Sequence, residues 1–196
     1  MRHLKILIRL LSFFGLIVSA SYSGAGEPTV QLSETINEFV QILASTPASE
    51  LRTKGLPEKA LTLVFNRFDF TEMAKRSLGR HWNTLGASER REFVQAFTQK
   101  LLNTYGRTVR ATGDEKIAYE RETTDGKYSS VETRVSSSGG ETAIGYRLHA
   151  VEGQWKVYDV VIENVSIVNN YRAQFDRVIA KSSVQELLQK IKQQDS

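Results

Sequence analysis

Few side chains in this 196-residue sequence have the types and spacing that catalysis or metal binding requires. The sequence contains no cysteine, which excludes disulfides, thiolate metal sites and cysteine nucleophiles. His3 lies in the N-terminal segment, and His81 and His149 fit no metal-binding spacing such as HExxH. A GxSxG elbow, a Walker loop and a GxGxxG motif are also absent from the sequence. We therefore expect no cofactor and no metal site.

Asp159 is an acidic residue within an apolar strand pattern, and two interpretations compete for it. A catalytic carboxylate normally works with a second acid or base, and the sequence shows no such partner. The simpler interpretation makes Asp159 the partner of a nearby arginine or of a backbone donor. A Ser-His-Asp triad assembled from distant positions is the alternative that the sequence leaves open.

The N-terminal segment has the pattern of a secretory signal peptide. Three basic residues precede the apolar run 10–18, which is too short to cross a bilayer comfortably. Small residues follow, and cleavage after Ala20 or after Ala25 fits the usual rule. We therefore expect a signal peptide at 1–25 and a single domain at 26–196. A short N-terminal membrane anchor is the alternative, and the missing cysteine excludes a lipoprotein.

The charge of the expected mature chain gives little reason to predict a nucleic-acid partner. The whole sequence has a formal net charge of +4, but residues 1–25 hold three of its basic side chains and no acidic one. Residues 26–196 therefore carry a net charge of +1. A nucleic-acid-binding domain would keep a basic surface after processing. With 40% hydrophobic residues, the composition is that of a globular protein.

Periodicity predicts helices at both ends of the domain and strands between them. Apolar residues recur at helical spacing in 32–43, 60–65, 70–78, 93–105, 168–179 and 184–191. Asp69 and Glu72 have the spacing of a capping box, as do Ser183 and Glu186. Alternation with period two then predicts four strands at 116–122, 127–136, 141–151 and 154–162.

The short, glycine-containing separators between these strands predict an antiparallel meander. In the fourth strand Tyr158, Val160 and Ile162 should share one face by simple alternation. That strand is apolar on both sides, so both of its faces should be covered. We predict an α+β fold in which a curved antiparallel sheet of four strands, or slightly more, is flanked by N- and C-terminal helices.

Two parts of the sequence resemble one known family in residue type and order. The first runs from Phe68-Asp69-Phe70 through Leu78-Gly79 to Phe93, and the second is 155–175, beginning WKVYDV. Both resemble the MlaC family of periplasmic phospholipid-binding proteins, also called the toluene-tolerance family. The resemblance covers roughly residues 30–195. Asn164 replaces a glycine that is frequent in the family, and Asn tolerates a left-handed backbone almost as well.

The resemblance implies a soluble periplasmic carrier rather than an enzyme, and we expect the carrier to be a monomer. Such proteins hold phospholipid acyl chains in a cavity between a curved sheet and helices, and leave the head group near solvent. The implied partners are an inner-membrane ABC transporter with an MCE-domain ring and an outer-membrane lipoprotein. The implied role is the maintenance of outer-membrane lipid asymmetry. Three alternatives remain: a carrier of another lipid such as a hopanoid, a small α+β enzyme acting on an apolar substrate, and a non-catalytic scaffold.

The predicted lipid-binding residues are apolar positions on the inward face of the sheet and on the helices beside it. Met73 is included because a thioether adapts to irregular contents. The full prediction is Phe70, Met73, Phe97, Leu101, Val131, Val135, Ile144, Tyr146, Tyr158, Val160, Ile162, Tyr171 and Phe175.

Overall fold

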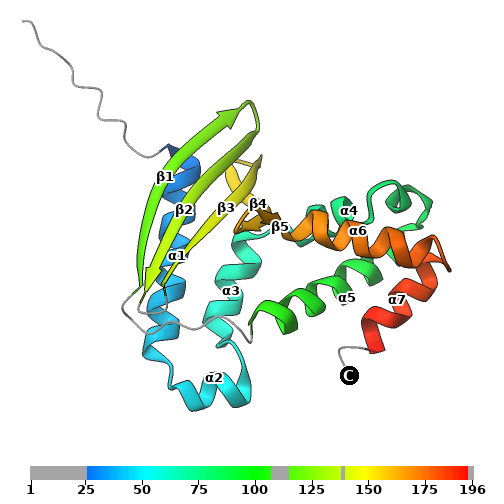
Figure 1. Cartoon of the computed structure of the whole chain (residues 1–196), viewed down its shortest axis with the longest axis horizontal. Coiled ribbons are helices and arrows are strands. Elements are labelled where there is room, and N and C mark those ends of the chain that lie inside the picture. The colour runs from blue at the N-terminus through cyan, green and yellow to red at the C-terminus, as the bar shows by residue number, and fades with distance from the viewer. Residues whose placement is uncertain (1–25, 107–114, 138–139, 194–196) are drawn as a thin grey trace, which may run out of the picture.

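The computed structural model describes residues 26–106, 115–137 and 140–193. The predicted signal peptide at 1–25 and both cleavage positions lie outside these residues. Within the described parts the chain forms helices, then strands, then helices again (Figure 1). This order is the predicted one and confirms the α+β class.

The helices before the sheet are α1 (Glu27–Ser45), α2 (Ala48–Lys54), α3 (Glu58–Arg67), α4 (Phe70–Leu78), the 3-10 helix η1 (Gly79–Thr84) and α5 (Ala87–Gly106). The strands are β1 (Lys116–Asp125), β2 (Tyr128–Ser137), β3 (Gly140–Val151), β4 (Gln154–Ile162) and β5 (Val165–Ser166). The chain continues with α6 (Ile167–Ile179) and α7 (Val184–Gln193).

The strands form one curved antiparallel sheet in chain order, β1-β2-β3-β4-β5. The predicted four-stranded meander is confirmed, and the two-residue β5 extends it by one strand. Gly126 and Gly153 stand in the turns with φ of 54° and 78°, a region that glycine enters without steric cost. These turns explain why the predicted separators end the strands where they do.

The sheet has an inner face, which we define as the side that α1 and α3 cover (Figure 1). Leu32 of α1 packs there against Val131, Leu148, Trp155 and Val157. We call these five buried residues the inner cluster. The cluster holds the N-terminal half of α1 against the middle of the sheet.

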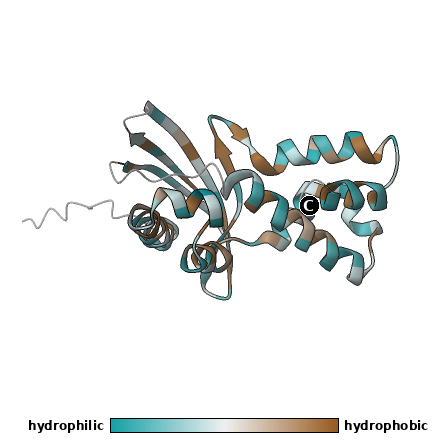
Figure 2. Cartoon of the chain, turned by 90° about the horizontal axis from the view of Figure 1, so that it is seen from below, coloured by the Kyte–Doolittle hydropathy of each residue, from teal (hydrophilic) through white to brown (hydrophobic). Residues whose placement is uncertain are grey.

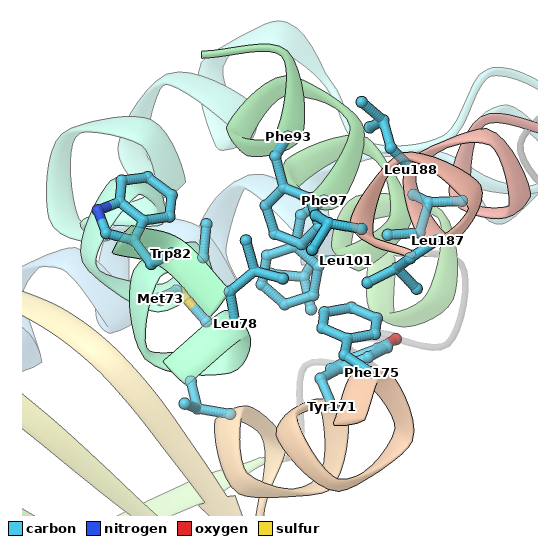
Figure 3. Close-up of a cluster of buried hydrophobic side chains, with 14 of the residues drawn as sticks. Met73, Leu78, Trp82, Phe93, Phe97, Leu101, Tyr171, Phe175, Leu187 and Leu188 are labelled. Atoms are coloured by element: carbon cyan, nitrogen blue, oxygen red, sulfur yellow. The ribbon is translucent and has the colours of Figure 1, made fainter. Parts of the chain in front are cut away.

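A second core lies among α4, η1, α5, α6 and α7, which extend to one side of the sheet (Figure 1). Figure 3 shows Phe93 and Phe97 of α5 facing Tyr171 and Phe175 of α6. The Phe97 and Tyr171 rings lie edge to face with centroids 5.1 Å apart. Hydrophobic and hydrophilic residues alternate along these helices (Figure 2), as expected for helices with one buried side. We call this group the helical core.

A β-bulge in β4 corrects the predicted faces of that strand. Leu148 pairs with Val157 and Arg147 pairs with Asp159, so Tyr158 is an extra residue without a partner in β3. The extra residue reverses the alternation, and Tyr158 turns to the outer face of the sheet, where its ring meets that of His149. The expectation that Tyr158 shares a face with Val160 and Ile162 was therefore wrong.

The predicted capping side chains accept hydrogen bonds at the starts of their helices, but the glutamates of the two capping boxes do not bind back to the capping residues. Asp69 Oδ1 accepts a hydrogen bond of 2.8 Å from the Glu72 N–H and so caps α4. Glu72 does not reach back, because its carboxylate binds Arg76 at 2.8 Å and Lys75. Ser183 Oγ accepts from the Glu186 N–H at the start of α7. These caps fix where the helices begin.

Candidate functional site

A cavity of about 430 Å³ lies between the inner face of the sheet and the helices that face it. Side chains from α1, α3, α4, α5, α6 and four strands contribute to its wall, so it lies between the sheet and the helices. Its lining is mostly apolar and consists of Leu32, Thr35, Ile36, Phe39, Val40, Leu43, Leu56, Val64, Arg67, Phe68, Phe70, Met73, Leu101, Leu102, Tyr105, Gly106, Glu115, Ile117, Val135, Ile144, Tyr146, Val160, Ile162 and Ile167.

Helix α1 supplies one wall through a continuous apolar stripe. Leu32, Ile36, Phe39, Val40 and Leu43 follow one another at spacings of three and four, which places them on one side of a helix. The opposite side of α1 is mostly polar. This pattern explains why α1 can close a hydrophobic space while exposing its other side.

The sheet supplies the facing wall as rows of paired residues. Ile117 of β1 lies opposite Val135 of β2, and Ile144 of β3 lies opposite Ile162 of β4. Further along the strands Tyr146 lies opposite Val160. Paired residues point to the same face, so each row adds a band of apolar surface.

The inner cluster closes the cavity at one end. Leu32 belongs both to the cluster and to the cavity wall, and Val131 lies directly opposite Tyr146 in the sheet register. The opposite end is bordered by Leu56 and Gly106, which lie next to each other, and by Glu115. The cavity is therefore an elongated space along α1 with a defined inner end.

The charged group of Arg67 at the wall already has partners. Its guanidinium donates to Thr35 Oγ1 at 2.9 Å, to Gln31 Oε1 at 3.0 Å and to the Trp155 carbonyl at 2.7 Å. Burial lowers the pKa of Arg67 from its ordinary value, and Glu34 opposes that shift. The side chain thus joins α1, α3 and β4 and is not directed at a ligand.

A second polar contact fixes the start of α1. The register of β1 shifts between Tyr119 and Arg121, so Glu122 lies opposite Val131 and on the inner face. Glu122 Oε2 accepts hydrogen bonds from the Thr29 N–H at 3.0 Å and from Thr29 Oγ1 at 2.6 Å. A Cβ at Gly26 would collide with this carboxylate, so a larger residue there would force the Glu122 side chain to shift.

The tyrosines around the cavity are shifted toward their neutral forms. Burial raises the pKa of Tyr119 to about 12, and burial together with Tyr119 raises the pKa of Tyr146 still further. Burial, with Tyr171 nearby, also raises the pKa of Tyr105. Neutral phenols and apolar side chains together make a wall suited to hydrocarbon.

The structure brings eight of the thirteen predicted residues to the cavity wall. They come from α4, α5 and strands β2 to β4, and are Phe70, Met73, Leu101, Val135, Ile144, Tyr146, Val160 and Ile162. Their contact with a ligand stays a prediction.

The other five predicted residues lie outside the cavity wall. Phe97, Tyr171 and Phe175 interlock within the helical core, where they are at most 5% exposed (Figure 3). Val131 is fully buried in the inner cluster. Tyr158 lies on the outer face, where the Arg76 guanidinium stacks 4.1 Å from its ring centroid.

The sequence reasoning missed the contribution of α1 to the wall. Ile36, Phe39, Val40 and Leu43 line the cavity, as does Ile117 of β1. Their helical spacing predicted that they are buried, but the sequence does not say which element they face. The indications available in the sequence were the amphipathic pattern of this helix and its position before the sheet.

The groups that could have carried catalysis have structural partners. Asp159 accepts hydrogen bonds from Arg147, from Ser166 Oγ and from the Val168 N–H, which confirms the simpler interpretation of this residue. His149 pairs with Asp69 at 3.0 Å. In the described residues no group of three or more His, Asp or Glu side chains could hold a metal ion.

No helix within the described residues is both long and apolar enough to span a bilayer.

Two known proteins are similar in sequence to this chain over most of its length. The intermembrane phospholipid transport system binding protein MlaC of Haemophilus influenzae is 21% identical over 166 residues, covering 80% of this chain and 78% of that protein. The toluene tolerance protein ttg2D of Pseudomonas putida is 27% identical over 147 residues, covering 74% of this chain and 61% of that protein.

A solved structure shares the fold. The phospholipid-binding protein of Ralstonia solanacearum, determined in complex with a phospholipid, superposes with a TM-score of 0.77 at 22% identity, covering 87% of this chain and 97% of that chain. The family model described as "MlaC protein" matches residues 33–193, which is most of the sequence. The resemblance seen in the sequence is thereby confirmed, and the chain belongs to the MlaC family.

Proposed function

We propose that this chain is a periplasmic phospholipid-binding protein that carries lipid between the outer membrane and an inner-membrane ABC transporter with an MCE-domain ring. An outer-membrane lipoprotein is its second partner, and its transport keeps phospholipid out of the outer leaflet. Family membership supports this proposal, as do relatives named for intermembrane phospholipid transport and phospholipid binding. The signal-peptide pattern at 1–25 supports export.

The observation that carries the proposal is the apolar cavity of about 430 Å³. Each methylene kept out of water is worth about 0.8 kcal/mol, so an acyl chain of about 15 methylenes gains about 12 kcal/mol by entering such a space. A head group needs no burial and can stay in water. A carrier thus needs an apolar space that shields hydrocarbon from water, and the cavity between α1 and the sheet supports this role.

The polar groups of the cavity wall support binding rather than catalysis. Arg67 is held by three partners within the protein, and Asp159 lies away from the cavity with partners of its own. A hydrolytic or acid–base reaction would need a reactive pair beside the bound molecule. We therefore favour a lipid carrier over an enzyme acting on an apolar substrate.

The proposal is tested by the lipid that the purified protein retains. We expect denaturing mass spectrometry to find phospholipid released from the wild-type protein. Val40→Asp places a carboxylate in the cavity wall and should lower retained lipid at least about tenfold, because a charged group there must be desolvated.

The control is Val30→Asp, the same substitution on the exposed side of the same helix, where Val30 is 43% exposed. This variant should retain lipid like the wild type. Equal lipid retention in the Val40→Asp and Val30→Asp proteins, or a hopanoid as the released molecule, would contradict the proposal.

A further inference from the structure

The start of α1 is capped by the sheet and not by its own first residues. Gly26 occupies the N-cap position without a side chain, and Pro28 at the start of the helix has no N–H that needs an acceptor. The cap is Glu122 of β1, whose Oε2 accepts hydrogen bonds from the Thr29 N–H at 3.0 Å and from Thr29 Oγ1 at 2.6 Å. A carboxylate at this place also interacts favourably with the positive end of the helix dipole.

The second oxygen of the same carboxylate lies beside Gly26. A Cβ built on Gly26 would be 2.0 Å from Glu122 Oε1. The nitrogen and the Cβ of one residue are about 2.5 Å apart, so the Gly26 nitrogen lies within about 4.5 Å of Oε1. Thr124 Oγ1 donates a long hydrogen bond of 3.3 Å to this oxygen. Because a carboxylate oxygen has two lone pairs, Oε1 can accept from a donor at Gly26 as well.

The two predicted cleavage positions give Gly26 different chemistry. Cleavage after Ala20 leaves Gly26 inside the chain, where its nitrogen is a neutral amide. Cleavage after Ala25 makes Gly26 the first residue, and its α-amine is then mostly an ammonium at neutral pH. A positive charge at the N-terminus of a helix is opposed by the helix dipole, so such an ammonium needs an anion beside it.

Glu122 is the carboxylate placed to balance that charge. The partners that the described residues offer Glu122 are Thr29 and Thr124, and both are neutral. Glu27 is the acidic residue in the first turn of α1, but its side chain is exposed and accepts from Gln31 Nε2 at 2.9 Å, one turn further along the helix. An ammonium at Gly26 would therefore give the half-buried Glu122 the cationic partner that its neutral neighbours do not provide.

We propose that the precursor is cleaved immediately before Gly26 and that the new ammonium forms an ion pair with Glu122, which fastens the start of α1 to the sheet in the processed protein. Hydrolysis of this peptide bond by a signal peptidase consumes one water molecule and leaves a carboxylate on Ala25 and an ammonium on Gly26. The inference rests on the proposed export of the chain and is independent of the lipid it carries. It makes the attachment of α1 depend on processing.

The cleavage position is tested with the full precursor, expressed with its own signal peptide in a Gram-negative host. Intact mass and N-terminal sequencing of the periplasmic protein should give Gly26 as the first residue. Ala25→Leu should abolish cleavage before Gly26, because signal peptidase requires a small residue there, and the matched Ala20→Leu control should leave it unchanged. A mature chain that begins at Ser21 would overturn the inference and leave export standing. An uncleaved precursor would overturn both.

The ion pair is tested by a double-mutant cycle on the mature chain. Proteins that begin at Gly26 or at Ser21, each with and without Glu122→Gln, are unfolded in urea at pH 7. Both starts keep an N–H at Gly26, so the cycle isolates the charge. We expect Glu122→Gln to raise the unfolding equilibrium constant at least about fivefold more in the chain that begins at Gly26. This excess should shrink in about 1 M NaCl, which screens a partly exposed charge pair.

The control for the cycle is Glu132→Gln, the same substitution at an exposed position of β2. It should change the unfolding equilibrium constant equally in the two chains. An equal effect of Glu122→Gln in the chains that begin at Gly26 and at Ser21, or an excess that salt does not reduce, would overturn the ion pair.

Discussion

Asp159 is 1% exposed and its carboxylate accepts three hydrogen bonds, from Arg147 at 3.0 Å, Ser166 at 2.6 Å and the Val168 N–H at 3.0 Å. These contacts join β3, β4, β5 and the first turn of α6. A carboxylate at the N-terminus of a helix also interacts favourably with its dipole. The residue that most resembled a catalytic acid in the sequence thus connects the sheet to the helical core.

We expect Asp159→Ala to lower the free energy of unfolding by about 3 kcal/mol, because it leaves buried donors of Ser166 and Val168 without an acceptor. Arg147→Ala should cost only about 1 kcal/mol, since its side chain is 43% exposed and solvent screens its charge. Urea unfolding followed by circular dichroism measures both. Wild-type stability in Asp159→Ala would show that the carboxylate serves something other than the fold.

Tyr119 has a buried hydroxyl, and the described residues offer it no hydrogen-bond partner. A buried polar group without a partner costs about 1–3 kcal/mol. Tyr119→Phe should therefore raise the free energy of unfolding at pH 7 by about 1 kcal/mol. A fall in stability would mean that the hydroxyl has a partner in solution.

The same residue gives the protein a pH dependence at high pH. Tyr119 ionises near its ordinary pKa of 10 in the unfolded chain and at about 12 in the folded protein. Between these values the unfolded chain has lost the proton while the folded protein keeps it, so stability falls as pH rises from about 10 to about 12. Urea unfolding at pH 9 and pH 11 should show a smaller decline for Tyr119→Phe than for the wild type. Equal declines would contradict this assignment.

At the scale of the elements, we expect the attachment of α1 to the sheet to limit how easily lipid enters and leaves. Gln31 is central to that attachment, because its side-chain oxygen accepts from Arg67 at 3.0 Å and from the Trp155 N–H at 2.9 Å. The C-terminal half of α1 faces the cavity with Phe39, Val40 and Leu43.

We expect Gln31→Ala to lower the free energy of unfolding by about 1–2 kcal/mol and to speed lipid transfer to acceptor vesicles. The control is Gln41→Ala, which makes the same change at an exposed position of the same helix. Transfer of a fluorescent phospholipid measures the rate. If Gln31→Ala exchanged lipid no faster than Gln41→Ala, the attachment of α1 would not limit exchange.

The elements themselves were largely predictable, and the two bulges were not. Hairpin turns depend on local residues such as Gly126 and Gly153, which the sequence displays directly. The extra residues Glu120 and Tyr158 are set by distant contacts: Glu122 meets Thr29, and Tyr158 stacks on Arg76. Simple alternation therefore assigns the residues on one side of each bulge to the wrong face.

At the scale of the whole molecule, the α+β architecture followed from the order of the elements, and the position of the cavity between sheet and helices followed from the family resemblance. The sequence did not predict which apolar residues line the cavity and which belong to the solid core. Phe97 and Leu101 are four residues apart on the same stripe of α5, yet Phe97 is fully buried among aromatic rings and Leu101 reaches the cavity. Both uses require an apolar residue, so hydrophobic spacing cannot distinguish them.

The central claim is that hydrocarbon occupies the space between α1 and the inner face of the sheet. The most direct measurement is photocrosslinking with a phospholipid that carries a diazirine near the middle of an acyl chain, followed by peptide mass spectrometry. The account predicts adducts on α1 residues such as Ile36 and Phe39 and on Ile144 and Tyr146 of β3. Adducts confined to the helical core or to the outer face of the sheet would contradict it.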